Sequence, residues 1–240
     1  MTRSPRNLHE HLRDQVGQDI VAGRLAAGTI VKAEDLRARY DVSLSVVREV
    51  VRVLESLGML RPVKRVGLVV LAMREWTLLD PLVIRWRMTE APAGQLRSLT
   101  ELRVAIEPEA AALAARHATA EVAEEIMTLA ARMRSSGRQG DVEAFLDADV
   151  AFHRAVLGAG GNELFAAFDT VIGEILAGRT GAGLMPQFPH PDALQWHFDV
   201  ADSIGRQEPG RAREAMAKIV AKADDEMGSV WADEPRHPGR

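Results

Sequence analysis

The sequence contains no cysteine among its 240 residues. A disulfide framework is therefore excluded, and so is a metal site built on thiolates. The chain also lacks a run of about 18 apolar residues, the length of a membrane span. Its first residues, MTRSPRNLHEHLRDQV, lack the apolar stretch of a secretion signal. With no membrane partner indicated, we expect a cytoplasmic protein.

Charge is distributed unevenly along the chain, whose formal net charge is −4. Residues 1–74 contain 13 Lys and Arg against 8 Asp and Glu, whereas the remainder contains 17 against 26. A chain of 240 residues is long enough for two domains, each with its own core. A basic module joined to an acidic one is typical of a DNA-binding head on a body that does not touch DNA.

Residues 33–60 predict two short helices joined by a tight turn. The turn falls at 41–43, because Asp and Ser side chains bond nearby backbone and disfavour helix interiors. Ser43 or Ser45 can then cap the second helix. Apolar residues recur in that helix at helical spacing and form one stripe that faces a core. They are Val47, Val50, Val51, Leu54 and Leu57.

A basic hairpin follows the two helices. Gly58 ends the second helix where a left-handed residue is expected, and residues 61–70 form two valine-rich runs around a basic turn, which predicts a β-hairpin wing. Such a helix can lie in the major groove, where arginine pairs with base edges or phosphates. The alternative is that the arginines are ordinary solvated charges. The candidate DNA contacts are Ser43, Ser45, Arg48, Arg52, Lys64, Arg65 and Gly67.

This stretch resembles the winged helix-turn-helix of the GntR family. The matching residues are Glu34, Leu36, Val42, Ser43, Val47, Arg48, Glu49, Leu54, Glu55, Gly58, Met59 and Gly67. Leu44 departs from the pattern, because the family commonly has an arginine there that touches DNA. The resemblance implies binding to a double-stranded DNA operator, whose sequence it leaves open.

From residue 95 onward nearly every segment predicts helix, since alanine is abundant and the breaks are short. The expected fold is mainly α: an N-terminal winged helix-turn-helix with a small β-wing, and a C-terminal antiparallel helical bundle. We expect a DNA-binding domain (1–74), a linker and helix (75–94), a helical domain (95–230) and a disordered tail (231–240). The expected bundle helices are 95–118, 120–135, 142–158, 163–176, 193–205 and 209–230, with a loop or lid at 177–191.

A candidate metal site lies in the helical domain. Asp149 and His153 are one turn apart on one helix face, and His197 lies in a later helix. A carboxylate and two imidazoles can hold a divalent ion such as Zn²⁺, Mn²⁺ or Ni²⁺ with positions left open. An Asp–His pair at this spacing is also common as a surface hydrogen bond, so the spacing leaves both interpretations open.

The same region resembles the FCD domain, the effector-binding bundle of the FadR subfamily of GntR regulators. The matching segments are 101–103, 107–111, 149–157 and 161–162. The resemblance implies a metal that is bound by one Asp and three His and whose coordination is completed by a small carboxylate effector. The chain has Ile219 where the third histidine is expected. A metal on Asp149, His153 and His197 and a metal-free polar pocket are therefore both open.

The resemblance also implies effector contacts. Arg103 is expected to grip the effector carboxylate with its planar fork, the alternative being a salt bridge to Glu107. Asn162 is either an effector contact or a helix cap. Residues 75–86 resemble the interdomain segment of sugar-acid regulators, in particular galactonate-operon repressors. This implies an aldonate such as galactonate or gluconate as the effector.

These features together predict a homodimeric transcription regulator, a repressor rather than an enzyme, whose operator affinity a small carboxylate controls. One alternative is a metal-dependent hydrolase or lyase built on Asp149, His153 and His197. It lacks a distinct general base at recognisable spacing. The other is an architectural DNA binder without an effector, which predicts a filled bundle core with no polar cavity.

Overall fold

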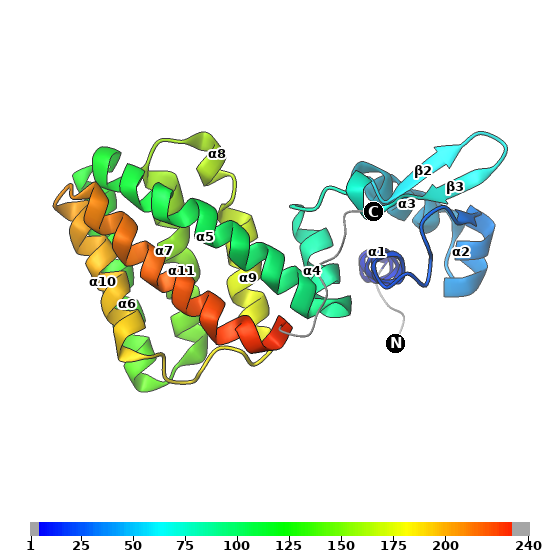
Figure 1. Ribbon diagram of the computed structural model, residues 1–240. Coiled ribbons are helices and arrows are strands. Elements are labelled where there is room, and N and C mark those ends of the chain that lie inside the picture. The colour runs from blue at the N-terminus through cyan, green and yellow to red at the C-terminus, as the bar shows by residue number, and fades with distance from the viewer. Residues whose placement is uncertain (1–4, 232–240) are drawn as a thin grey trace. The chain divides into compact units, whose positions relative to one another are not determined.

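The structure is a computed structural model that describes residues 5–231 (Figure 1). The chain divides into two compact units, one ending at Gln95 and the other beginning at Leu96. No helix in the described part of the chain is long and apolar enough to cross a membrane.

The first unit is a small helical domain with a short antiparallel sheet of strand order β1-β3-β2. The sheet register pairs Leu60 with Val70 and Val63 with Gly67. The expected hairpin is therefore confirmed. The elements are α1 (Pro5–Val21), β1 (Ile30–Val31), α2 (Ala33–Tyr40), α3 (Leu44–Ser56), β2 (Leu60–Val63), β3 (Gly67–Val70), a 3₁₀ turn η1 (Met73–Glu75) and α4 (Pro81–Glu90).

The turn between α2 and α3 forms as its residue types predict. Asp41 ends α2 in the left-handed conformation at φ 50°, and Ser43 caps α3 by accepting a hydrogen bond from the Val46 backbone N–H at 3.4 Å. The predicted apolar stripe of α3 is buried. After α3, Gly58 adopts φ 70°, and a Cβ there would collide with the Glu75 carbonyl oxygen. Glycine is required at this position for both reasons.

Helix α4, expected in the linker, packs within the first unit against α1. Asp80 caps it by accepting from the Leu82 N–H at 2.9 Å, and Pro81 occupies its first turn. The buried Trp86 ring lies where a Cβ on Gly17 would be, and its indole N–H donates to Asp14 at 3.1 Å. The tryptophan thus anchors α4 to α1.

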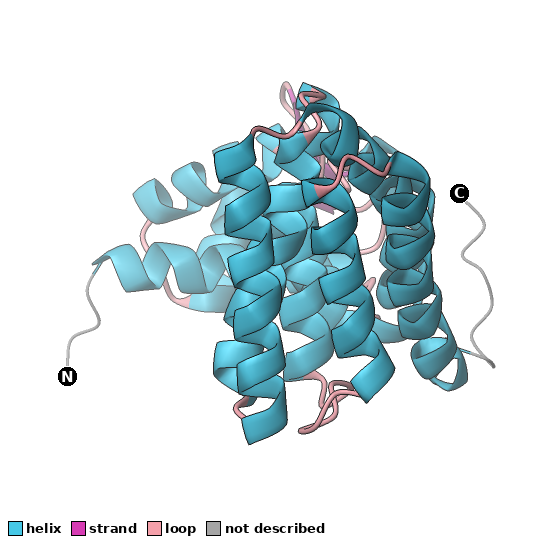
Figure 2. Cartoon of the chain, turned by 90° about the vertical axis from the view of Figure 1, so that its left-hand side faces the viewer, coloured by secondary structure: helices cyan, strands magenta, loops and turns pink. Residues whose placement is uncertain are grey.

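The second unit is a helical bundle, whose long helices Figure 2 shows side by side. Helix α6 packs against α7 and α10, α10 against α11, and α7 against α9. The apolar core between them includes Phe152, Met133 and Ile126. The elements are α5 (Pro92–His117), α6 (Ala120–Gln139), α7 (Val142–Ala159), α8 (Glu163–Ala166), α9 (Asp169–Gly181), α10 (Pro191–Gly205) and α11 (Pro209–Trp231).

Four expectations about helix boundaries in this bundle were wrong. Helix α6 continues past the predicted break at 135–137, because the Ser136 hydroxyl bonds the Arg132 carbonyl one turn back at 2.9 Å. The helix expected at 163–176 is two helices, and α9 runs on to Gly181, which shortens the expected loop. Trp231, assigned to a disordered tail, is the last residue of α11 and is buried; residues 232–240 lie outside the described part.

Candidate DNA-binding surface and effector cavity

The exposed face of α3 is the candidate DNA-reading surface. Arg48 and Arg52 are exposed on it, and neither forms an ion pair with another residue in the described part of the chain. Ser45 is also exposed, with its hydroxyl 2.8 Å from that of Ser43, so the two hydroxyls form one polar group at the start of the helix. Cations without protein partners are available to phosphates and base edges.

The wing adds further positive charge. Lys64 and Arg65 are exposed at the turn between β2 and β3, and Arg65 adopts the left-handed conformation at φ 66°. Gly67 lies inside β3 instead, at φ 136°, and a Cβ there would be 3.0 Å from the Val31 carbonyl oxygen. The reason for glycine at this position is the close approach of β1.

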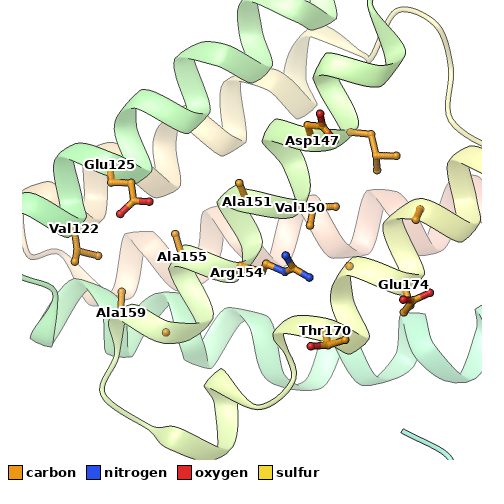
Figure 3. A pocket seen from close by; sticks show the side chains of 14 residues that line it. Val122, Glu125, Asp147, Val150, Ala151, Arg154, Ala155, Ala159, Thr170 and Glu174 are labelled. Carbon is orange, nitrogen blue, oxygen red and sulfur yellow. The ribbon is translucent and has the colours of Figure 1, made fainter. Parts of the chain in front are cut away.

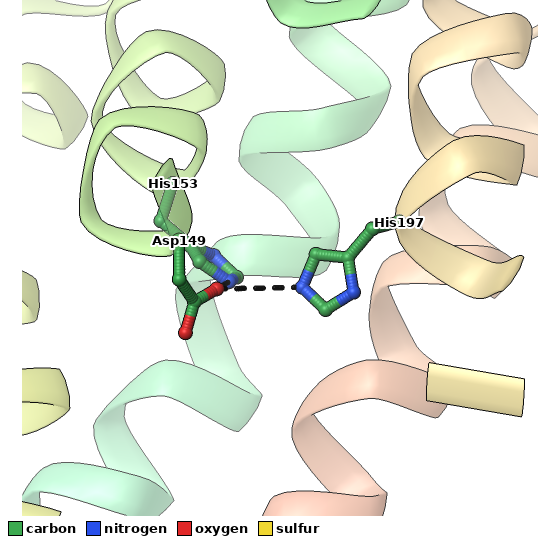
Figure 4. A group of neighbouring side chains, drawn as sticks. All are labelled: Asp149, His153 and His197. Atoms are coloured by element: carbon green, nitrogen blue, oxygen red, sulfur yellow. Dashed lines mark ion pairs between the residues drawn. The ribbon is translucent and has the colours of Figure 1, made fainter. Parts of the chain in front are cut away.

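Asp149, His153 and His197 meet in the interior of the second unit, and all are buried (Figure 4). Asp149 and His153 come from α7 and His197 from α10. Asp149 Oδ1 lies 3.3 Å from His153 Nε2 and 3.5 Å from His197 Nε2. Burial opposes ionisation of Asp149, but the two imidazoles outweigh burial and hold the pKa of this carboxyl well below its usual range.

This geometry fits a divalent metal. Ligand bonds of about 2.0–2.2 Å in a tetrahedral site place ligand atoms roughly 3.3–3.6 Å apart. His197 donates from Nδ1 to the Ala193 carbonyl at 2.7 Å, which leaves the Nε2 lone pair directed at Asp149. His197 Nε2 and Asp149 Oδ1 are both buried without a hydrogen-bond partner. An imidazole oriented through its other nitrogen is typical of a metal ligand.

Two neighbours of this cluster affect how well it could bind a metal. Ile219 of α11 is buried and lines the same cavity, so its position contributes an aliphatic side chain and no ligand atom. Arg103 Nη2 lies 3.4 Å from His153 Nε2, the nitrogen that would bind the ion. An ion on this nitrogen would lie beside the guanidinium, and the two positive charges would repel each other.

Arg103 forms the salt bridge that the sequence offered as an alternative and also lines the cavity. The residue is 1% exposed, and its Nε donates to Glu107 Oε1 at 2.6 Å. Its Nη1 is buried without a partner. Glu107 Oε2 also lies 2.7 Å from His153 Nδ1. The salt bridge thus leaves Nη1 of the guanidinium without an acceptor and available to a ligand.

The charged groups of this network stabilise one another's ionised forms. Burial alone would raise the pKa of Glu107, but Arg103 and His153 outweigh burial and lower the pKa to about 2. Burial alone would lower the pKa of His153, but Glu107 and Asp149 outweigh burial and raise the pKa to about 9. Without a metal, the buried network is therefore charged at neutral pH.

The cluster opens into a cavity of about 60 Å³. The segment between α9 and α10 lines it with Met185, Pro186, Pro189 and His190. Small-molecule pockets are usually about 300–1,000 Å³, so this volume holds a few waters and a sugar acid needs the covering segment to move. A charged cavity in the core contradicts the alternative of an architectural DNA binder with a filled bundle.

Three further charged residues that were not expected from the sequence line this cavity: Lys222, Glu226 and, most deeply buried, Arg179 on α9. Arg179 is 4% exposed and its Nε has no hydrogen-bond partner. A signal for it was present, because Ile172, Ile175, Leu176 and Arg179 follow the spacing of a buried helical stripe. A charge on such a stripe indicates a polar interior.

Asn162 lies outside the cavity. Its side chain caps α8 by accepting from the Leu164 N–H at 3.0 Å, which is the other role the sequence allowed, and the expected effector contact is absent from the cavity lining. A wider, more open hollow of about 800 Å³ lies along α6, α7 and α9 (Figure 3). Its lining combines exposed Arg154 and the carboxylates Glu125, Asp147 and Glu174 with mostly small side chains, and none of its polar atoms is among the buried unpartnered groups of the described residues.

These two units define a class of protein. A winged helix-turn-helix with exposed cations, joined to a bundle with a buried charged cavity, is the architecture of a DNA-binding regulator with a ligand-binding body. Residues 8–70 match the family of bacterial regulatory proteins, gntR family, and residues 98–222 match the FCD domain. The chain belongs to the GntR family of transcription regulators, in the branch that carries an FCD domain.

Relatives of known description agree with this assignment. The chain is 32% identical to YieP of Escherichia coli, described as an uncharacterized HTH-type transcriptional regulator, covering 68% of this chain and 72% of the relative. It is 28% identical to the galactonate operon transcriptional repressor of E. coli, covering 90% and 94%. A probable D-xylose utilization operon repressor of Paenarthrobacter nicotinovorans is 28% identical, covering 88% and 84%. The comparisons give the hydrolase or lyase alternative no support.

Solved structures share the fold at low sequence identity. A protein described as Lar, of Listeria monocytogenes, superposes with a TM-score of 0.59 at 16% identity, covering 96% of this chain and 99% of that one. McbR/YncC of E. coli superposes with a TM-score of 0.53 at 15% identity, covering 96% and 100%. The fold class expected from the sequence is therefore confirmed.

Proposed function

We propose that the protein represses a sugar-acid operon, binding operator DNA as a homodimer in the cytoplasm and responding to an aldonate such as galactonate or gluconate. The observation that carries this proposal is the buried cavity at Arg103, Asp149, His153 and His197 in a chain whose first unit is a winged helix-turn-helix. The similarity to a galactonate operon repressor along most of both chains supports a sugar acid in particular.

The DNA contacts in this proposal come from α3 and the wing. Arg48 and Arg52 reach bases or phosphates in the major groove, and Lys64 and Arg65 contact the backbone beside it. Ser43 and Ser45 present hydroxyls at the start of α3, which carry less binding energy than the arginines because they are uncharged. Gly67 acts indirectly, by allowing the wing to pack on β1.

The effector contacts come from the buried network. Arg103 offers its unpartnered Nη1 to the effector carboxylate, and His153 and His197 bond its hydroxyls. A divalent ion (Zn²⁺, Mn²⁺ or Ni²⁺) held by Asp149, His153 and His197 would act as a Lewis acid, and the effector carboxylate would complete its coordination. The effector favours a conformation in which the two heads no longer match the operator half-sites.

Thermal unfolding of the whole protein against a panel of sugar acids, with and without a chelator, tests this function. A ligand at 100 times Kd adds about 2.7 kcal/mol, and each kcal/mol raises the midpoint by roughly 2–4 °C at this size. A rise that the chelator and Asp149→Asn abolish identifies a metal site; a rise that survives the chelator identifies a metal-free pocket. No rise with any sugar acid would contradict the proposed effector class.

A further inference from the structure

Arg179 lies in the effector cavity in an unusual state for an arginine. The residue is 4% exposed, although it comes from the last turn of α9, where an arginine is ordinarily solvated. Burial lowers the pKa of its guanidinium, and the neighbouring Arg103 lowers the pKa further. The protein therefore holds a second guanidinium in the cavity at a cost in free energy.

The contacts of Arg179 do not account for this charge. Its single ion pair among the described residues joins Nη2 to Glu226 Oε2 at 3.5 Å, and Glu226 also faces Lys222 Nζ at 3.7 Å. The Glu226 side chain is 33% exposed, so the pair is long, shared and screened by solvent. The Nε of Arg179 has no hydrogen-bond partner.

The buried carboxylates of the cavity are already engaged elsewhere. Glu107 pairs with Arg103 and His153, and Asp149 lies between the two imidazoles. Neither forms an ion pair with Arg179 in the described part of the chain. Two guanidiniums thus line one cavity, each with a buried N–H that lacks an acceptor, at Arg103 Nη1 and at Arg179 Nε.

We propose that Arg179 is a second anion-binding group of this cavity, so that the preferred effector is a sugar acid with two acidic groups. This proposal rests on the proposed function, since it takes the cavity as the effector site. Arg103 receives one carboxylate and Arg179 the second acidic group, which is a carboxylate in an aldarate or a phosphate in a phosphorylated aldonate. A planar guanidinium suits both kinds of anion.

Calorimetric titration of the full-length protein with matched acids tests this preference. The pairs are galactonate with galactarate, and gluconate with glucarate and with 6-phosphogluconate. We expect at least one diacid to bind ten times more tightly than its aldonate. Whether the aldarate or the phosphorylated aldonate binds more tightly identifies the second acidic group as a carboxylate or a phosphate. Equal or weaker binding of every diacid overturns the proposal for Arg179 and leaves the sugar-acid function standing. If no acid binds, both fail.

Variants separate a ligand contact from a structural role. Arg179→Gln should weaken the diacid at least tenfold and change aldonate affinity by less than threefold, whereas Glu226→Gln, which removes a negative charge from the cavity lining, should not weaken the diacid. Arg154→Gln is the matched control, because it removes an exposed guanidinium outside the cavity. Equal weakening of both acids by Arg179→Gln would assign the residue a structural role and overturn the proposal. If Arg179→Gln does not fold, the comparison of diacid with aldonate binding to the wild-type protein decides whether the proposal holds.

Discussion

Replacing Arg103 with glutamine should strongly destabilise the helical unit. The change leaves Glu107, 1% exposed, without the guanidinium that bonds it at 2.6 Å. Breaking a buried ion pair by removing one partner costs about 3–5 kcal/mol. His153 remains 2.7 Å from the same carboxylate, so the cost should lie at the low end, about 3 kcal/mol. At roughly 2–4 °C per kcal/mol, the midpoint should fall by about 6–12 °C.

The double variant Arg103→Gln, Glu107→Gln tests the cause of this loss. Removing both charges should recover a large part of the stability, because no buried carboxylate is then left unpaired. Differential scanning calorimetry of the wild type, both single variants and the double variant gives the coupling. A fall below 2 °C for Arg103→Gln, or strict additivity in the double variant, would refute the buried network. Sugar-acid binding should remain lost in the recovered double variant, because its effector contact is missing.

Three further changes probe the packing, the charges and the metal ligands. Gly17→Ala should destabilise the first unit by about 1–3 kcal/mol in denaturant unfolding, because the new Cβ would lie 2.6 Å from the Trp86 ring. With a chelator present, the stability that ionised Glu107 contributes to the folded protein should be lost as pH falls from 4.5 towards about 2. The stability that protonated His153 contributes should be lost as pH rises from 6.5 through about 9. A thermal unfolding midpoint that does not change across both pH ranges would contradict these pKa values. Ile219→His should tighten Zn²⁺ binding at least tenfold in competition titrations, and unchanged affinity would show that its side chain does not reach the ion.

The sequence predicted those features that depend on local periodicity and turn chemistry. The stripe from Val47 to Leu57 fixes which face of α3 is buried, and the Asp149–His153 spacing fixes their common face. The stripe of α9 could have indicated that Arg179 is buried, but its neighbours in the cavity come from other helices, and no local pattern specifies them. The break expected at Ser136 failed for a related reason: a serine hydroxyl that bonds the preceding turn is compatible with a buried helix interior.

The sequence placed Gly67 among the candidate DNA contacts and left Asn162 open between an effector contact and a helix cap, and the backbone surroundings explain both residues. Gly67 is set by the close approach of β1, and Asn162 by the unpaired N–H groups at the start of α8. Both residue types serve structural roles at such places. The difference becomes visible when neighbouring strands and helices are placed around them.

The most direct test of the account is operator affinity with and without effector. Fluorescence anisotropy on a duplex selected from random DNA would compare the wild type with Arg48→Ala and its control Leu44→Ala, since only the arginine can bond DNA directly. The account predicts that saturating effector weakens wild-type binding about 5- to 150-fold, and that Arg48→Ala weakens binding far more than Leu44→Ala. Operator affinity unchanged by an acid that demonstrably occupies the cavity would contradict the account.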